Sequence, residues 1–146
     1  MDNAIPKFIA SKHIAVIGVS AKRRKFGNII YSELKKKSYH AYPINSKADL
    51  IDGEQCYRDL LQVPDEVKAA VVVVKPEHTD GLVEMAAEKG IEILWFQQGA
   101  NFSEVAEAAT NAGIAVIQRK CLLMYAPPVT GIHAVHRFFA KLFNRL

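Results

Sequence analysis

A glycine and a cluster of cations follow the first apolar run of the chain, and these residue types bind phosphate. Segment 13–28 reads HIAVIGVSAKRRKFGN, so Gly18 ends the apolar run and four cations lead into the start of a helix. A glycine allows a tight backbone turn, and the first turn of a helix offers unpaired amides at the positive end of its dipole. The pattern predicts a site for a diphosphate. Its candidate residues are Gly18, Val19, Ser20, Lys22, Arg23, Arg24, Lys25, Phe26, Gly27 and Asn28.

A run of four cations is often only a solvated loop. Its position favours binding, because in an open parallel sheet the ligand lies across the carboxyl ends of the strands, where the strand order reverses. The same argument makes candidates of the residues that follow the later predicted strands. They are Asn45, Ser46, Lys75, Pro76, Gln97, Gly99 and Cys121.

Strands and helices alternate in the segments that must position these residues. Apolar runs without polar alternation are typical of strands covered on both faces. Strands are predicted at 14–17, 40–45, 69–74, 91–96 and 114–117. Helical spacing of apolar residues predicts helices at 4–11, 27–37, 77–89, 103–112 and 132–146, and segment 52–65 is expected to be a long connection with one helical turn.

This alternation implies right-handed crossovers. We therefore expect an α/β fold, a Rossmann-like open parallel five-stranded sheet with helices on both faces, in a three-layer sandwich. With the strands numbered along the chain, the expected order is 3-2-1-4-5. Pro43 lacks an amide and argues against a fully paired interior position for the second strand, whereas Trp95, inside the fourth, is expected in the core.

The composition narrows the class of protein. The chain has 146 residues, half of them hydrophobic, which suits a single domain over residues 1–146 with its core at about 10–125 and a C-terminal helix at 132–146. The net charge of +4 fits an anionic ligand as well as nucleic acid. Cys56 and Cys121 form no CxxC motif, and no apolar run approaches the about 20 residues that span a bilayer. We expect a cytoplasmic protein with no membrane segment.

The type of nucleotide is narrowed by two positions. The usual NAD fingerprint needs a G-x-G-x-x-G loop and an acid at the end of the second strand. Here the loop reads GVSAKR and the strand ends in Asn45, which with Ser46 and the basic loop would tolerate a phosphorylated ribose. The residues therefore disfavour NAD and leave NADP open.

Six short motifs, in this order along the chain, resemble the small stand-alone CoA-binding proteins. Their domain is similar to the CoA-binding domain of succinyl-CoA ligase alpha subunits. The motifs are IAVIGVS at 14–20, FGN at 26–28, YPIN at 42–45, VVKP at 73–76, LWFQQGA at 94–100 and RKC at 119–121. The resemblance implies binding of coenzyme A, free or acylated. It implies a diphosphate at 18–20 and the Gly27 helix start, a ribose and its phosphate near Asn45 and the basic loop, and adenine beside Lys75 and Pro76.

The chain departs from the family pattern in the basic loop. Family loops often carry a proline before the arginine and a serine before a tyrosine-glycine pair, and a proline often follows the asparagine of the second strand. Here segment 21–26 reads AKRRKF and Ser46 follows Asn45, so the sequence does not assign a cation to each phosphate.

No complete catalytic constellation is visible. The ligases that the chain resembles also need a domain with a phosphorylatable histidine and a partner subunit, and 146 residues hold neither. Cys121 has no base nearby in sequence and is expected to be a buried side chain, while His133 and His136 have no further ligand at a spacing that suits a metal. We expect binding that is non-catalytic or acts through a partner.

Two alternative functions stay open, and so does a homodimer. An NADP-binding redox domain would use the same loop, and a basic module for nucleic acid would use that loop with 35–37 and 137–145, although no helix-turn-helix pattern or aromatic platform supports it. The aromatic stripe of the helix at 132–146 would pack on the fold or form a homodimer seam.

Overall fold

The structure, a computed structural model, describes residues 4–22 and 24–125. One sheet contains five strands: β1 His13–Ile17, β2 His40–Ile44, β5 Ala69–Val72, β6 Ile93–Gln97 and β7 Ala115–Lys120. Their order is β2-β1-β5-β6-β7, and all neighbouring strands are parallel. The expected Rossmann-like α/β fold is therefore confirmed, and β2, the strand that contains Pro43, lies at an edge.

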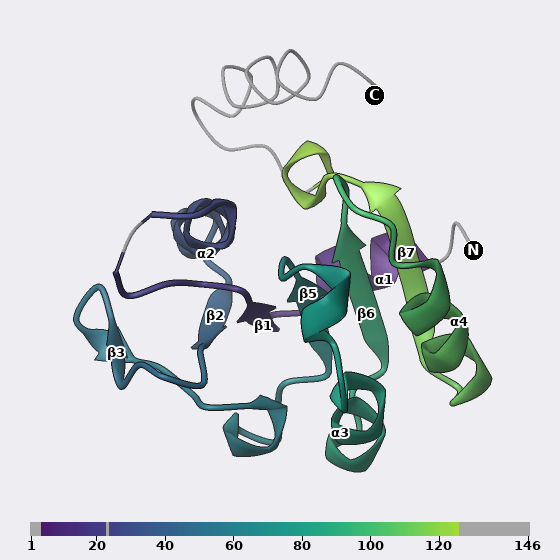
Figure 1. The fold of residues 1–146 in the computed structure, drawn as a ribbon. Helices are drawn as coiled ribbons and strands as arrows, with labels where there is room; N and C mark the ends of the chain where they lie inside the picture. The colour runs from purple at the N-terminus through teal and green to yellow at the C-terminus, as the bar shows by residue number, and fades with distance from the viewer. Residues whose placement is uncertain (1–3, 23, 126–146) are drawn as a thin grey trace.

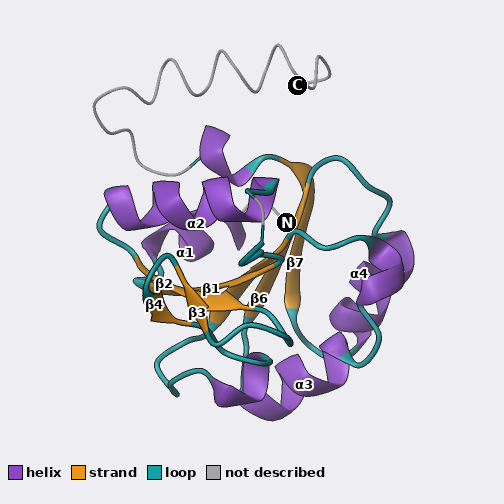
Figure 2. Ribbon diagram, turned by 60° about the vertical axis from the view of Figure 1, so that its left-hand side comes forward, coloured by secondary structure: helices purple, strands orange, loops and turns teal. Residues whose placement is uncertain are grey.

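Helices cover both faces of the sheet (Figure 2). One face carries α1 Ala4–Ala10 and α2 Phe26–Lys36, and the other carries α3 Leu82–Lys89 and α4 Ser103–Asn111. The shorter elements are the hairpin of β3 Leu50–Ile51 and β4 Glu54–Gln55 and the 3-10 turns η1 Leu60–Gln62, η2 Pro76–His78 and η3 Leu122–Met124.

The two faces of the sheet belong to two apolar clusters, which explains the absence of polar alternation in the strands. Successive residues of β6 point to opposite faces, so that Trp95 packs beneath α1 and Phe96 packs against the α3 and α4 side. Trp95 is fully buried, its ring meets Phe8 edge-on at 5.1 Å, and its indole Nε1 donates to the Lys120 carbonyl at 2.9 Å. The predicted core role of Trp95 is confirmed.

The predicted strand order of 3-2-1-4-5 is wrong. The third strand of the sheet along the chain, β5, pairs with β1 on the side away from β2, which gives 2-1-3-4-5 in the same numbering. The cause is the face that the connection from β2 to β5 covers. Its apolar residues Leu60 and Val63 pack on the face opposite α2, and a right-handed crossover on that face carries the chain back across β1. The strand order consequently reverses between β1 and β5 (Figure 1).

The element bounds differ from the prediction most clearly after β5. The predicted helix at 77–89 is divided into η2 and α3, because Gly81 takes a left-handed conformation with φ of 75° that interrupts a helix. The expected helical turn within 52–65 is present as η1. The predicted helix at 132–146, with its homodimer seam and its two histidines, lies outside the described residues. In the part of the chain that the structure describes, no helix has the length and apolar character needed to cross a membrane.

Two adjacent leucines test whether packing by the η1 connection stabilises this topology. Leu60 is 2% exposed beneath the sheet, whereas Leu61 is 36% exposed. We expect Leu60→Ala to lower the free energy of unfolding by about 2–4 kcal/mol, because it removes buried methyl groups and leaves a cavity. The matched control Leu61→Ala should change it by less than about 0.5 kcal/mol. Urea unfolding measures both, and equal effects would show that Leu60 does not anchor the connection.

Candidate functional site

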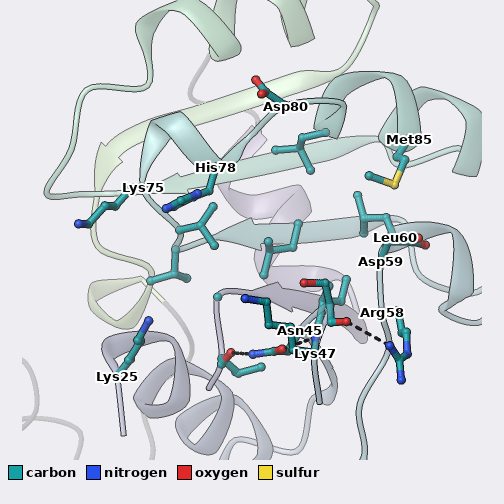
Figure 3. Close-up of a pocket in the computed structure, with 18 of the residues that line it drawn as sticks. Lys25, Asn45, Lys47, Arg58, Asp59, Leu60, Lys75, His78, Asp80 and Met85 are labelled. Carbon is teal, nitrogen blue, oxygen red and sulfur yellow. Dashed lines mark hydrogen bonds between the residues drawn. The ribbon is translucent and has the colours of Figure 1, made fainter. Parts of the chain in front are cut away.

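A cleft of about 1090 Å³ lies at the carboxyl ends of the strands, at the point where the strand order reverses. The segments that follow β1, β2 and β5 enclose it, together with η1 and the start of α3 (Figure 3). This is the position at which open α/β sheets bind their ligands. Its volume is comparable with that of clefts that hold small molecules and cofactors.

Two glycines bring the first turn of α2 against the end of β1. A Cβ atom on Gly27 would lie 2.3 Å from the carbonyl oxygen of Gly18, a contact that no side chain tolerates. Gly18 itself has φ of 125°, and a Cβ there would lie 3.0 Å from the backbone of Val73. Only glycine fits at either position, since β1, α2 and the segment after β5 approach one another through their backbones.

Two asparagine side chains hold the loop between β1 and α2. The buried Asn28 accepts hydrogen bonds from the amides of Ser20 at 3.0 Å and Lys25 at 3.2 Å, and its Nδ2 donates to the Ser20 carbonyl at 2.9 Å. From the end of β2, Asn45 donates through Nδ2 to the carbonyl of Val19 at 2.8 Å. These bonds fix the backbone that borders the cleft, so a ligand meets a preformed surface.

Cations occupy two separate ends of the cleft. Lys25 and Lys75 lie at one end, Arg58 lies at the other, and Asn45 and Lys47 lie between them (Figure 3). The three lysines form no ion pair with another described residue, since the salt bridges of the described chain involve other cations. Lys25 also directly precedes the first turn of α2, where the helix dipole adds to its charge. The cleft is therefore suited to an anion with more than one charged group.

An apolar wall lies at the Arg58 end of the cleft. Leu60 and Met85 are seen there beside Asp59 (Figure 3), and Leu82 belongs to the same cluster as Leu60. The Asp59 carboxylate accepts the amide of Leu61 at 2.9 Å and so caps η1. Leu60 and Leu82 are buried and Met85 is partly exposed, so a flat apolar ring would bury surface chiefly against Met85.

The hairpin of β3 and β4 connects the cleft to α2. At its tip, Glu54 accepts a hydrogen bond from the hydroxyl of Tyr31 at 3.2 Å and pairs with Lys35 at 2.8 Å. The hydrogen bond from Lys35 holds the pKa of Glu54 below its ordinary value, while burial raises the pKa of Tyr31. Lys47 precedes the hairpin and Arg58 follows it. The contacts of Glu54 therefore link the segment that carries these two cations to α2, the helix at the Lys25 end of the cleft.

The structure brings about half of the predicted site residues together. Those that line the cleft are Gly18, Val19, Arg24, Lys25, Phe26, Asn45, Ser46 and Lys75. The loop is held by hydrogen bonds between Ser20 and Asn28 and by the packing of Gly27 on Gly18, but these contact residues Ser20, Gly27 and Asn28 do not line the cleft. Lys22 is exposed and does not line it either. Pro76 borders a neighbouring groove, and Arg23 lies outside the described residues.

Three predicted residues, Gln97, Gly99 and Cys121, lie away from the cleft. They follow β6 and β7, which are beyond the point of reversal because β5 lies between β1 and β6. The Gln97 Oε1 accepts the amide of Leu122 at 3.1 Å. Cys121 is fully buried, and burial raises the pKa of its thiol, which disfavours a nucleophilic thiolate.

Sequence reasoning missed several residues of the cleft. Lys47 continues the loop that contains Asn45 and was within reach of the same argument. Arg58 and the apolar wall had no local signal, because the hairpin that returns Arg58 to the cleft and the reversal beside β5 both depend on contacts distant in sequence.

Comparisons with known proteins agree in family and in fold. A family model described as a CoA binding domain matches residues 12–127. An ADP-forming acetate–CoA ligase of Methanocaldococcus jannaschii is 32% identical over 119 residues, which are 76% of this chain. A solved hypothetical protein from Pyrococcus horikoshii OT3 superposes with a TM-score of 0.75 and 32% identity, over 84% of this chain and 87% of its own.

Larger proteins contain the same unit. Dinucleotide-forming acetyl-coenzyme A synthetase 1 of Ca. Korarchaeum cryptofilum, in its apo form, superposes with a TM-score of 0.66 and 27% identity, over 77% of this chain and 27% of that one. This chain spans 17% of the length of the M. jannaschii ligase. The similarity therefore covers one part of each larger protein.

Replacement of Gly27 by alanine tests the close approach of α2 to β1. Helix propensity alone would favour alanine by about 1 kcal/mol. We expect instead a loss of about 1–3 kcal/mol in the free energy of unfolding, because the added Cβ forces the backbones apart. The control Gly53→Ala meets no atom within 4 Å and carries only the cost of its φ of 81°, about 1 kcal/mol. A Gly27→Ala variant as stable as the native chain in urea would contradict the close approach.

A pH series on Glu54→Gln tests the attachment of the hairpin to α2. The pKa of Glu54 is lowered in the folded state, so its stabilising effect is complete above the unfolded value of about 4.3 and is lost as the pH falls through the folded value. We expect the native chain to be more stable than the variant at neutral pH, with a difference that shrinks in acid. The control Glu107→Gln, at an exposed position of α4, should show no such trend in urea unfolding. A difference independent of pH would contradict the role of the carboxylate charge.

Proposed function

We propose, from the premise that this chain belongs to the CoA binding domain family, that its cleft binds coenzyme A or an acyl-CoA. The family match confirms the resemblance indicated by the sequence motifs. The observation that carries the proposal is the packing of Gly27 on Gly18, which puts the first turn of α2 beside the end of β1. A helix start with neighbouring cations is a suitable partner for the diphosphate of the coenzyme.

The layout of the cleft supports one orientation of the nucleotide. The diphosphate would lie at the end with Gly18, Lys25 and Lys75, where the helix start and the cations meet. The purine would lie on the apolar wall of Leu60 and Met85 at the other end, with the ribose between them. We favour this orientation over adenine beside Lys75 and Pro76, since Pro76 lies outside the cleft.

We propose that the chain contributes binding and that any acyl transfer requires a partner. The ligase relative is far longer, and this chain corresponds to 17% of it. The buried Cys121 thiol, with its raised pKa, supports a structural role over nucleophilic chemistry. We place the protein in the cytoplasm, where free thiols such as Cys56 and Cys121 stay reduced.

Parallel calorimetric titrations with CoA, dephospho-CoA, NADP and NAD test the proposal. We expect CoA to bind most tightly and dephospho-CoA to bind at least about tenfold more weakly, a difference of about 1.4 kcal/mol, because the cleft offers cations to a ribose phosphate as well as to the diphosphate. NAD should give no measurable heat. The affinity for CoA should also fall as the salt concentration rises, since exposed cations are screened.

Each ligand in this set has a separate meaning. NADP that binds while CoA does not would favour a redox domain and overturn the proposal. Equal binding of CoA and dephospho-CoA would keep the diphosphate site and exclude recognition of the ribose phosphate. A short single-stranded oligonucleotide that binds more tightly than CoA would favour a nucleic-acid module.

A further inference from the structure

Arg58 is held against the cleft by two partners on the loop that follows β2. Its Nη1 donates to the carbonyl of Ser46 at 3.2 Å, and its Nη2 donates to Asp49 Oδ1 at 2.9 Å. The same loop contains Asn45 and Lys47, which line the cleft. The guanidinium is therefore fixed at the edge of the binding surface, at the end opposite Lys25 (Figure 3).

Stability of the fold does not account for this arrangement. The side chains of Arg58 and Asp49 are 61% and 84% exposed, and exposed ion pairs contribute little to folding. A guanidinium has five N–H donors, of which the contacts to Ser46 and Asp49 use two. The remaining donors are available to an anion, and the planar group is suited to two parallel bonds with phosphate.

We propose that Arg58 is the specificity-determining residue that selects ligands with a phosphate on the ribose, and that Asp49 is a positioning residue for its guanidinium. This inference rests on the proposed function. A purine on the apolar wall would place its ribose near Arg58, because Leu60 of that wall follows Arg58 by two residues and Met85 and Arg58 lie at the same end of the cleft. A phosphomonoester on that ribose would accept hydrogen bonds from Arg58, with Lys47 adding charge from the neighbouring loop.

The position of Arg58 separates its effect from that of the cations at the opposite end of the cleft. Lys75 lies at the opposite end, beside the proposed diphosphate, which CoA and dephospho-CoA share. Loss of Lys75 should weaken both ligands in the same proportion. Loss of Arg58 should weaken only the ligand that carries the additional phosphate.

The experiment titrates CoA and dephospho-CoA into the native chain, Arg58→Met, Arg58→Lys and the matched control Lys75→Met. Methionine keeps an aliphatic side chain at position 58, and urea unfolding establishes that each variant is folded. We expect Arg58→Met to weaken CoA about tenfold, or about 1.4 kcal/mol, and to change dephospho-CoA by less than about twofold. Arg58→Lys should retain part of the preference, and Lys75→Met should leave the preference unchanged while both affinities fall.

Asp49 is tested by its effect on the same preference. Asp49→Ala should reduce the ratio of the two affinities, and Asp49→Asn should restore it, because an amide oxygen can still accept the hydrogen bond from Arg58. A ratio unchanged by Asp49→Ala would overturn the positioning role.

The outcomes separate this inference from the proposed function. If the native chain prefers CoA and Arg58→Met or Arg58→Lys keeps the full preference, or if Arg58→Met weakens both ligands alike, the role of Arg58 is overturned and CoA binding stands. If the native chain binds neither ligand, the proposed function falls and this inference falls with it.

Discussion

The close approach of two backbones, at Gly27 and Gly18, is the constraint on which the rest of the site depends. A helix can present its first amides to a ligand at the end of a strand only if no side chain separates the two elements. Here a Cβ on Gly27 would meet the Gly18 carbonyl, and a Cβ on Gly18 would meet Val73 of the segment after β5. The end of β1, the start of α2 and the segment after β5 thus converge at one point, and Asn28 and Asn45 fix the loop between β1 and α2.

The reversal of the strand order places this convergence beside the cleft. Because β5 lies next to β1 on the side away from β2, the segments that leave these strands diverge and leave the cleft between them. The segment after β5 contributes Lys75, and the long return from β2 contributes Lys47 and Arg58. Cations therefore reach the cleft from opposite sides, although in the sequence they appear as isolated charges. Glu54 attaches the hairpin within this return to α2 through Tyr31 and Lys35.

Local chemistry in the sequence was sufficient to indicate Gly18 and Asn45, which line the candidate cleft. Both features can be recognised from residues within a few positions. One is an apolar strand that ends in Gly18, and the other is a polar residue, Asn45, at the end of the next strand. The strand order did not follow from such signals, because it depends on which face Leu60 and Val63 cover, and either face would suit an apolar side chain. The same limit explains why Arg58 was missed and why Cys121, a candidate because it follows a predicted strand, lies away from the cleft.

In the proposed function the two ends of the cleft have different roles: the Gly18 end contributes affinity, and the Arg58 end contributes selectivity. The end at Gly18 combines backbone amides, a helix dipole and Lys25, and these groups suit any nucleotide that carries a diphosphate. The end at Arg58 offers an apolar wall and a guanidinium already held by Asp49, which suits a phosphate whose position varies from one nucleotide to another. Because Arg58 is held by the loop after β2, outside the sheet, the proposed role of this end in selecting the ligand is independent of the backbone contacts at Gly18. The proposed recognition of coenzyme A thus combines a diphosphate site built into the fold with a selective contact at its edge.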